Sequence, residues 1–166
     1  EAAHEEGMSV YADIVLNPRM GGDEIQAVTV HQVNGENRNE IVKEAFEAEA
    51  MTMFTFPGRN GKYSDFVWDA QCFSGIDKVR TGHEELEGIF KIHNEYGTDW
   101  NDNVSHQFGN YDYLMGADVE FRNPYVVVEL RRWIKWYIET TKVDGLRMDA
   151  LKHISTEFLK KWIDYI

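Results

Sequence analysis

The sequence contains a single cysteine, Cys72, and this excludes some classes of protein at once. One thiol cannot form a disulfide within the chain, and it cannot supply a cysteine-based zinc cluster. Long apolar runs are also absent, because no segment approaches the roughly 20 residues that a membrane-spanning helix needs. The sequence therefore does not indicate a disulfide-stabilised scaffold, and we predict no association with a membrane.

Basic side chains are scarce relative to acidic ones. The 17 Lys and Arg residues stand against 29 Asp and Glu residues, which gives a formal net charge of −12. Such a surface repels the phosphates of nucleic acids and the head groups of anionic membranes. An acidic balance suits a neutral substrate, a cation or simply solubility. We therefore predict no nucleic-acid partner.

Proline is rare, at three residues, whereas hydrophobic residues make up 43% of the chain and aromatic residues 13%. This is a globular composition, and 166 residues are enough for one domain with a sizeable core. The chain begins without Met on what resembles a last helical turn ended by Gly7. It closes on an amphipathic helix, Phe158 to Ile166. We therefore expect a fragment of a longer protein.

The order of the expected elements indicates an α/β fold. Met8 to Asn17 is a strand candidate with apolar residues on both faces, as in a sheet covered on both sides. A helix is expected to begin with Asn123 as its cap and Pro124 at its first position. Its predicted buried stripe is Val126, Leu130, Trp133, Ile134 and Tyr137. A second strand follows at Val143 to Ala150, which completes a parallel crossover unit.

The segment between these elements, Pro18 to about Ala117, is too long for a simple connection and predicts an inserted subdomain. Ala27 to Val33 is β-branched and alternating, as a strand should be. Ile41 to Ala50 is either a helix, from its Glu and Ala content, or an acidic strand paired with the first. Further strands are expected at Met51 to Phe56 and at Gly88 to Ile92. The insertion is thus predicted to be mainly β.

The second strand of the crossover unit carries the strongest chemical signal. Because side chains alternate along a strand, Arg147 and Asp149 share one of its faces. A fixed positive charge beside a carboxylate keeps that carboxylate ionised and aims it, as a carboxylate nucleophile requires. The alternative is a structural ion pair at the end of the strand, and the two residues alone do not separate these interpretations.

The segment from Asn94 to Asn123 is rich in Asn, Asp, Gly and aromatic residues and has little periodicity. Carboxylate and amide oxygens are the ligands that a hard cation such as Ca²⁺ prefers. An ordinary surface loop is the alternative interpretation of the same composition.

Three segments of the chain, taken in order, form a recognisable pattern. They are Asp13-Ile-Val-Leu-Asn17, Asn110-Tyr-Asp112-Tyr-Leu-Met-Gly-Ala-Asp118 and Asp144-Gly-Leu-Arg147-Met-Asp149-Ala-Leu-Lys152-His153. The first and third resemble the first two motifs of the α-amylase family of retaining glycoside hydrolases, and the second resembles the calcium-loop motif of that family. Thr55 to Arg59 and Tyr63 to Phe66 further resemble the inserted domain of bacterial liquefying and cytoplasmic amylases.

The resemblance implies an α/β fold: a fragment of a (β/α)₈ TIM barrel with an inserted, mainly β, B domain after the third strand. Residues 1–17 would form the end of barrel helix 2 and strand 3. Residues 18–118 would form the B domain and the calcium loop. Residues 119–166 would form helix 3, strand 4 and the start of helix 4. The active site would lie at the carboxyl ends of the strands.

The resemblance also implies the roles of the charged pair. Asp149 would be the nucleophile that forms a covalent glycosyl-enzyme, and Arg147 would hold it ionised. Retaining chemistry needs a second carboxyl group roughly 5 Å away as general acid/base. In the family that group lies on the fifth strand, which would place it beyond Ile166. The 166 residues alone are accordingly expected to be inactive.

By the same resemblance, three further residues belong to substrate binding. Lys152 and His153 would line the leaving-group side of the sugar cleft, and Asp13 would support the nucleophile through hydrogen bonds. The chain departs from the family after Asn17, where Pro18 replaces the usual His that contacts the sugar. Since proline has no side-chain donor, we expect one substrate hydrogen bond to be missing.

The calcium motif implies a structural Ca²⁺ as cofactor. Its ligands would be Asn17, Asp112, Asp118 and the backbone carbonyl of His153. The ion would tie the inserted domain to the barrel and order the cleft. After Asp118 the chain has acidic Glu120 but basic Arg122, which argues against a cluster of several metal ions.

The resemblance finally implies an endo-acting hydrolase of α-1,4-glucosidic bonds in starch, glycogen and maltooligosaccharides, monomeric at full length. Pro18 leaves open a related transglycosylase, an oligo-α-glucosidase or a catalytically silent carbohydrate-binding relative. The single cysteine and the resemblance to cytoplasmic amylases favour a cytoplasmic location over secretion.

Overall fold

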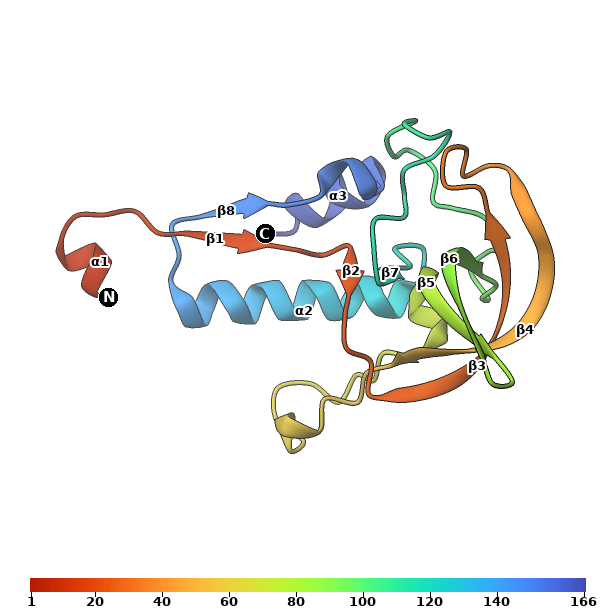
Figure 1. Cartoon of the computed structure of the whole chain (residues 1–166). Coiled ribbons are helices and arrows are strands. Elements are labelled where there is room, and N and C mark those ends of the chain that lie inside the picture. The colour runs from red at the N-terminus through yellow and green to blue at the C-terminus, as the bar shows by residue number, and fades with distance from the viewer.

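The computed structural model describes all residues, 1–166, and consists of two parts that lie end to end (Figure 1). One part holds a two-stranded sheet, β1 and β8, together with the long helix α2 and the shorter α3. The other part is a six-stranded sheet made almost entirely from the middle of the chain. A short helix, α1 (Ala2–Glu5), stands apart at the N-terminal end and is followed by Gly7 at φ +71°.

The small sheet is parallel. β1 (Tyr11–Ile14) pairs with β8 (Gly145–Met148) in a register that places Asp13 opposite Arg147. Parallel neighbours need a crossover connection, and α2 (Pro124–Thr141) supplies its helix, as the sequence predicted. A second helix, α3 (Thr156–Ile163), follows β8.

Within these 166 residues the first strand, predicted to be covered on both faces, is covered on one. Ala12 and Ile14 are buried, but Tyr11 is 67% exposed and Val15 49% exposed. The exposed face has no element packed over it, so that burial alternates along the strand as it does in a sheet covered on one side.

Helix α2 begins and packs as its sequence predicted. The side chain of Asn123 accepts hydrogen bonds from the backbone N–H groups of Tyr125 and Val126, and Pro124 occupies the first turn. The helix ends at Lys142, which takes up the left-handed conformation. The fully buried residues of the predicted stripe are Val126, Leu130 and Ile134, and its half-buried residues are Trp133 and Tyr137.

The larger sheet has the strand order β2-β7-β5-β4-β3-β6. Its strands are β2 (Pro18–Arg19), β3 (Glu24–Val33), β4 (Ile41–Met53), β5 (Phe73–Thr81), β6 (Glu84–Ile92) and β7 (Ala117–Val119). Because β5 also pairs with β6, the four strands β3 to β6 close into a ring, whereas β2 and β7 extend it towards the small sheet. The mainly β character predicted for the insertion is confirmed.

The open alternative at Ile41 to Ala50 resolves as a strand. This segment is the first part of β4, antiparallel to β3, with Val28 opposite Ala48. Ala48, Ala50 and Thr52 are buried while the residues between them are exposed, which is the period of two that a strand requires. Pairing with β3 therefore overrides the helical preference of its Glu and Ala residues.

The remaining elements are short. They are the 3₁₀ turns η1 (Pro57–Arg59), η2 (Ala70–Cys72) and η3 (Leu151–His153). One continuous core joins both sheets, running from Ile14 and Trp162 in the first part to Phe73 and Phe90 in the second. None of the helices is long and apolar enough to cross a membrane. The division into residues 1–17, 18–118 and 119–166 expected from the sequence stays a prediction.

Candidate functional site

The pair predicted on β8 is part of a three-residue charge cluster. Arg147 Nη1 donates to Asp13 Oδ1 at 2.8 Å and to Asp13 Oδ2 at 3.0 Å, and it lies 2.7 Å from Asp149 Oδ1. The parallel register brings Asp13 there, since it stands opposite Arg147. The hydrogen bond to Asp13 raises the pKa of Arg147 above its ordinary value, and the charges of Asp13 and Asp149 add to this. The arrangement holds the guanidinium of Arg147 between two solvent-accessible carboxylates.

The backbone turns sharply just after Asp149. Asp149 N–H donates to the carbonyl of Ile14 at 2.9 Å, which ties it to the end of β1. The next residue, Ala150, has φ +54°, a left-handed conformation that costs a residue with a side chain roughly 1–2 kcal/mol. The surrounding structure imposes that turn, and it directs the chain from the strand into η3. Nothing in the sequence around Ala150 signals it.

Lys152 and His153 lie on η3 against the loop that precedes β7. His153 Nδ1 donates to the carbonyl of Tyr111 at 2.7 Å, and the two rings are 4.1 Å apart. Lys152 Nζ donates to Gln107 Oε1 at 3.2 Å and stands 4.7 Å from the centre of the Tyr111 ring. Burial lowers the pKa of His153, so its imidazole is neutral at pH 7 and the Nδ1 proton is fixed by the carbonyl. The sequence did not single out Tyr111 or Gln107.

Three of the predicted cation ligands meet directly. Asn17 Nδ2 donates to Asp118 Oδ1 at 2.8 Å and to the carbonyl of His153 at 3.2 Å. The second oxygen of Asp118 accepts from Ser74 Oγ at 2.7 Å. Asn17 follows β1, Asp118 lies in β7 and His153 follows β8, so this group lies where the two sheets join.

The fourth predicted ligand, Asp112, lies nearby in the same buried region. Its Oδ2 accepts from the backbone N–H of Asn101 at 2.9 Å and from its side chain at 2.8 Å. Burial, above all, raises the pKa of Asp112 to about 7. Burial and then the charge of Asp112 raise the pKa of Asp118. The side chains of Asn17, Asp112 and Asp118 are completely buried.

Two oxygens of this group lack any hydrogen-bond partner: Asn17 Oδ1 and Asp112 Oδ1. A buried polar atom without a partner is costly, and two buried carboxylates repel each other unless a cation lies between them. The structure has no group of three or more His, Cys, Asp or Glu side chains placed to share a metal. Two carboxylates, an amide and a backbone carbonyl are instead oxygen ligands, which fit a hard cation such as Ca²⁺.

The basic residue noted after Asp118 is used to neutralise a buried carboxylate. Arg122 Nε and Nη2 donate to the two oxygens of Glu120 at 2.8 and 2.6 Å, and Glu120 is fully buried. Asn94 Nδ2 donates to Glu120 Oε2 at 3.3 Å. Glu120 is therefore satisfied by protein groups, in contrast to Asp112.

Pro18 begins β2, where its backbone pairs with Asp118 across the edge of the sheet. The first residue of an edge strand is a position where a missing N–H group breaks no ladder hydrogen bond. Proline is therefore compatible with the strand, although it offers no side-chain donor to a ligand.

A groove of about 690 Å³ lies elsewhere, on the ring of strands and beside β2. None of the predicted site residues lines it. Its charged groups are satisfied in part by one another, since Lys78 pairs with Glu85 at 3.1 Å and with Glu87 at 2.9 Å. The cluster of Asp13, Arg147 and Asp149 therefore remains the candidate for the chemistry.

Comparison with known proteins gives a consistent result. A family model described as "Alpha amylase, catalytic domain" matches residues 1–162. The cytoplasmic alpha-amylase of Escherichia coli (strain K12) is 46% identical over 100% of this chain and 33% of its own length. An alpha-amylase of Geobacillus stearothermophilus is 41% identical over 98% of this chain and 29% of its own length.

A third relative is the glucan 1,4-alpha-maltohexaosidase of Bacillus sp. (strain 707), 40% identical over 96% of this chain and 30% of its own length. The chain thus spans about a third of the length of these curated relatives.

Proposed function

Because the chain belongs to the α-amylase family, we propose that the protein is a glycoside hydrolase that cleaves internal α-1,4-glucosidic bonds of starch, glycogen and maltooligosaccharides. The names of the relatives support this substrate class. The observation that carries the proposal is the cluster in which Arg147 lies between Asp13 and Asp149 at the ends of two adjacent strands.

The proposed chemistry is a double displacement with retention of configuration. Asp149 is the nucleophile: its carboxylate attacks the anomeric carbon while the glycosidic C–O bond breaks and the leaving sugar's oxygen takes up a proton. Water then cleaves the resulting glycosyl-enzyme, which releases the sugar and restores the carboxylate. Arg147, at 2.7 Å, holds the carboxylate in its charged form and orients it. Asp13 shares the same guanidinium and keeps it directed towards Asp149. No residue of this chain is assigned the role of general acid/base.

Lys152 and His153 are proposed to contact the sugars on the leaving-group side. Both lie directly after the strand that carries Asp149. Because His153 Nδ1 carries the proton and donates it to the carbonyl of Tyr111, the Nε2 atom of the neutral ring is an acceptor. Lys152 adds a donor whose position is set by Gln107 and Tyr111.

Asn17, Asp112, Asp118 and the carbonyl of His153 are proposed to hold a structural Ca²⁺. The unpartnered Asn17 Oδ1 and Asp112 Oδ1 support this, because a cation supplies the partner that each oxygen lacks. The bound ion would neutralise the two buried carboxylates and join the loop of Asp112 to the strand ends.

The fold proposed for the whole is a (β/α)₈ barrel in which β1 and β8 are neighbouring strands and the six-stranded sheet is the inserted B domain. The parallel β1–β8 pair with its crossover helix α2 supports this, as does the insertion between them. Residues 1–17 and 119–166 are then barrel, and residues 18–118 are B domain and calcium loop.

The decisive test is hydrolysis of starch by the full-length protein before and after treatment with a strong calcium chelator. We expect a ladder of maltooligosaccharides with retained anomeric configuration, a fall in rate on chelation and recovery with Ca²⁺. If the untreated full-length protein does not hydrolyse starch, the proposed function is contradicted.

Pro18 favours a second candidate within the same class, a transglycosylase or an oligo-α-glucosidase, because it changes the donors available in the sugar site. Product analysis separates the candidates, since a single transfer product indicates a transglycosylase and release of glucose from short oligosaccharides indicates a glucosidase. A protein that binds the glucan without cleaving it would be a silent relative.

A further inference from the structure

One buried arginine of the ring of strands has no salt-bridge partner. Arg38 lies in the turn between β3 and β4 and is 7% exposed. None of the salt bridges of the structure includes it. Burial lowers its pKa, and its Nε has no hydrogen-bond partner. Arginine is seldom buried unless its charge is compensated, so the groups that surround this one need an explanation.

The rings and the hydrogen-bonding groups that contact Arg38 belong to the segment 100–113, which we call the aromatic loop. The Arg38 guanidinium stands 4.5 Å from the centre of the Tyr111 ring, 5.4 Å from that of Phe108 and 5.8 Å from that of Tyr113. Its Nη1 donates to the carbonyl of Tyr113. Its backbone N–H donates to the carbonyl of Phe108 at 2.8 Å, and its carbonyl accepts from Trp100 Nε1 at 3.0 Å. The rings stabilise the guanidinium charge together with the carboxylates of Asp118 and Glu36, neither of which forms a salt bridge with it.

The turn and the loop also fit closely on either side of this arginine. Gly109 has φ +82°, and a Cβ atom there would lie 2.7 Å from Asn37 Oδ1 and 2.8 Å from Asn39 Nδ2. Only glycine combines that backbone angle with such a close approach. The turn therefore approaches the loop closely at Gly109, on either side of Arg38.

The same loop contacts the substrate-binding residues. The carbonyl of Tyr111 accepts from His153 Nδ1, and its ring is contacted by Lys152 as well as by Arg38. Ser105 N–H donates to the carbonyl of Lys152 at 2.9 Å. One tyrosine thus links a buried cation of the turn to the two side chains placed on the leaving-group side.

We propose that Arg38 is a positioning residue, which holds the aromatic loop so that Tyr111 sets Lys152 and His153 for the sugars of the leaving group. This inference rests on the proposed function. It makes a residue of the larger sheet a determinant of how well the enzyme uses long substrates, without giving Arg38 any contact with the reacting atoms.

The test compares two substrates that differ in their need for the leaving-group side. Maltoheptaose places sugars there, whereas α-maltosyl fluoride loses only fluoride and needs no sugar contact on that side. In the full-length enzyme, we expect Arg38→Met to raise KM and lower kcat/KM for maltoheptaose by about 10-fold, since small misplacements of binding groups have effects of this size. We expect kcat/KM for α-maltosyl fluoride to stay within about twofold, because this variant leaves Asp149 and Arg147 in place.

Arg59→Met is the matched control. Arg59 also lies over a ring, 4.7 Å from that of Phe56, and also donates to a backbone carbonyl, that of Phe66, at 2.8 Å. Its contacts are local to the segment 56–66 and do not reach the aromatic loop. Any loss in this variant should therefore be equal for the two substrates.

A second variant and a second measurement cover the case in which Arg38→Met does not fold. Arg38→Lys keeps the charge over the rings but loses the planar fork, and we expect it to restore part of the maltoheptaose activity. Hydrogen exchange should quicken at the N–H of Tyr111, which donates to the carbonyl of Ser105 at 2.8 Å, while exchange in β3 and β4 stays unchanged.

Equal losses on both substrates, or unchanged exchange in the aromatic loop, would overturn the positioning role and leave the proposed function standing. An unaltered enzyme that hydrolyses neither substrate would overturn the proposed function, and the inference with it.

Discussion

At the scale of single residues, Arg147 contacts two carboxylates from two different strands. Each contact depends on a different feature of the chain. Its contact with Asp149 follows from their spacing on β8, whereas its contact with Asp13 follows from the register between β1 and β8. All three side chains are accessible, so the cluster is open to a ligand at the strand ends and is not part of the core.

Replacing the proposed nucleophile should remove activity without unfolding the protein. We expect Asp149→Asn in the full-length enzyme to lower kcat for starch by roughly 10⁴-fold, because an amide cannot form the glycosyl-enzyme. Starch hydrolysis and circular dichroism measure the two quantities.

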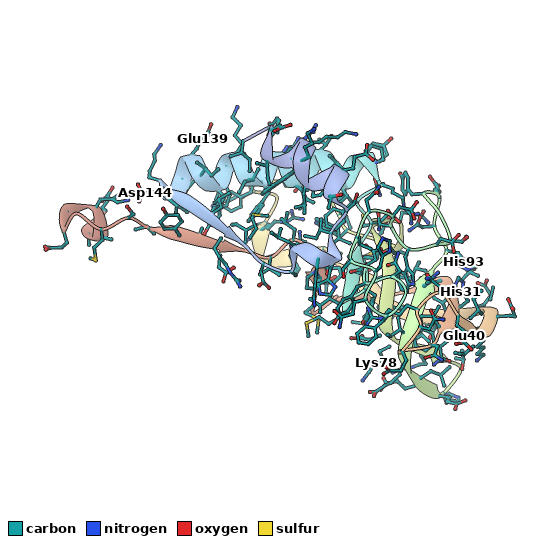
Figure 2. The ribbon with its side chains drawn as sticks, turned by 90° about the horizontal axis from the view of Figure 1, so that it is seen from above. His31, Glu40, Lys78, His93, Glu139 and Asp144 are labelled. Carbon is teal, nitrogen blue, oxygen red and sulfur yellow. The ribbon has the colours of Figure 1, made fainter.

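Asp144→Asn is the control for that variant. Asp144, labelled in Figure 2, lies just before β8. It lies 2.8 Å from His4 Nε2 and accepts from the N–H of Val10 at 2.7 Å, and it forms no hydrogen bond or salt bridge with Asp13, Arg147 or Asp149. It should retain activity, and substantial activity of Asp149→Asn would contradict the assignment of the nucleophile.

The sequence was informative about this site only as far as local spacing reaches. Arg147 and Asp149 share a strand face by periodicity, and the structure brings them together. Tyr111, Gln107 and the left-handed Ala150 were not foreseen, because their roles depend on how a loop folds against η3. Contacts between segments about forty residues apart leave no local pattern in the sequence.

At the scale of elements, helix α2 was predictable and the strands of the ring were less so. The cap at Asn123 and the apolar stripe are local signals, and both are confirmed. β5 was not among the expected strands, and β6 was expected to begin later, at Gly88. Their charged outer residues hide the alternation, and only pairing between the two strands reveals it.

Removing the cap of α2 should destabilise the protein measurably. Asn123→Ala deletes two cap hydrogen bonds and the bond from Asn123 Nδ2 to the carbonyl of Gln71, so we expect a loss of about 1–2 kcal/mol. Urea unfolding of the full-length protein measures it. Asn123→Asp keeps the acceptor and should lose clearly less. Equal losses for the two variants would mean that the cap is not what stabilises the helix start.

A pair of histidines should make the ring of strands sensitive to acid. His31 in β3 lies beside His93, just after β6, and their ring nitrogens are 2.7 Å apart (Figure 2). Burial, with the charges of Lys91 and His93, lowers the pKa of His31 to about 4, although Asp99 opposes this. The unfolded chain therefore binds the proton more readily than the folded one, and stability should fall as the pH drops from about 6.5 towards 4.

Thermal unfolding between pH 7 and 4.5 tests this expectation. His31→Gln should lose less of its Tm over that range than the unaltered protein does. His83→Gln, at an exposed histidine in the turn between β5 and β6, should behave like the unaltered protein. A His31→Gln variant with the same acid sensitivity as the unaltered protein would place the titrating group elsewhere.

At the scale of the whole molecule, the two sheets meet at the proposed cation ligands. Asn17, Asp118 and the carbonyl of His153 come from the connections and strands on both sides of that junction. The length of the insertion was predictable from the sequence, but the closure of β3 to β6 into a ring was not, since a closing pair such as β5 with β6 has no signature of its own.

Calcium should stabilise the full-length protein as a whole. Ca²⁺ added after chelation is expected to raise Tm progressively, and an excess of 100-fold over Kd corresponds to about 2.7 kcal/mol. In Asp118→Asn this dependence should shift to higher Ca²⁺ concentrations. Asp99→Asn, which removes an exposed carboxylate 3.4 Å from Lys91, should leave it intact. A Tm that does not change with Ca²⁺ in the unaltered protein would remove the metal site.

The pairing of β1 with β8 also constrains the order in which the chain folds during synthesis. Asp13 cannot bind Arg147 until that residue is added to the chain, 134 residues later. At about 5–20 residues per second, this delay is on the order of ten seconds. Strands β3 to β6 need only one another and are complete within that interval. The nascent chain therefore passes through a stage in which the ring of strands is assembled while β1 still lacks its pairing with β8. During those seconds the edge of β1 that later pairs with β8 is open to chaperones, or to another chain.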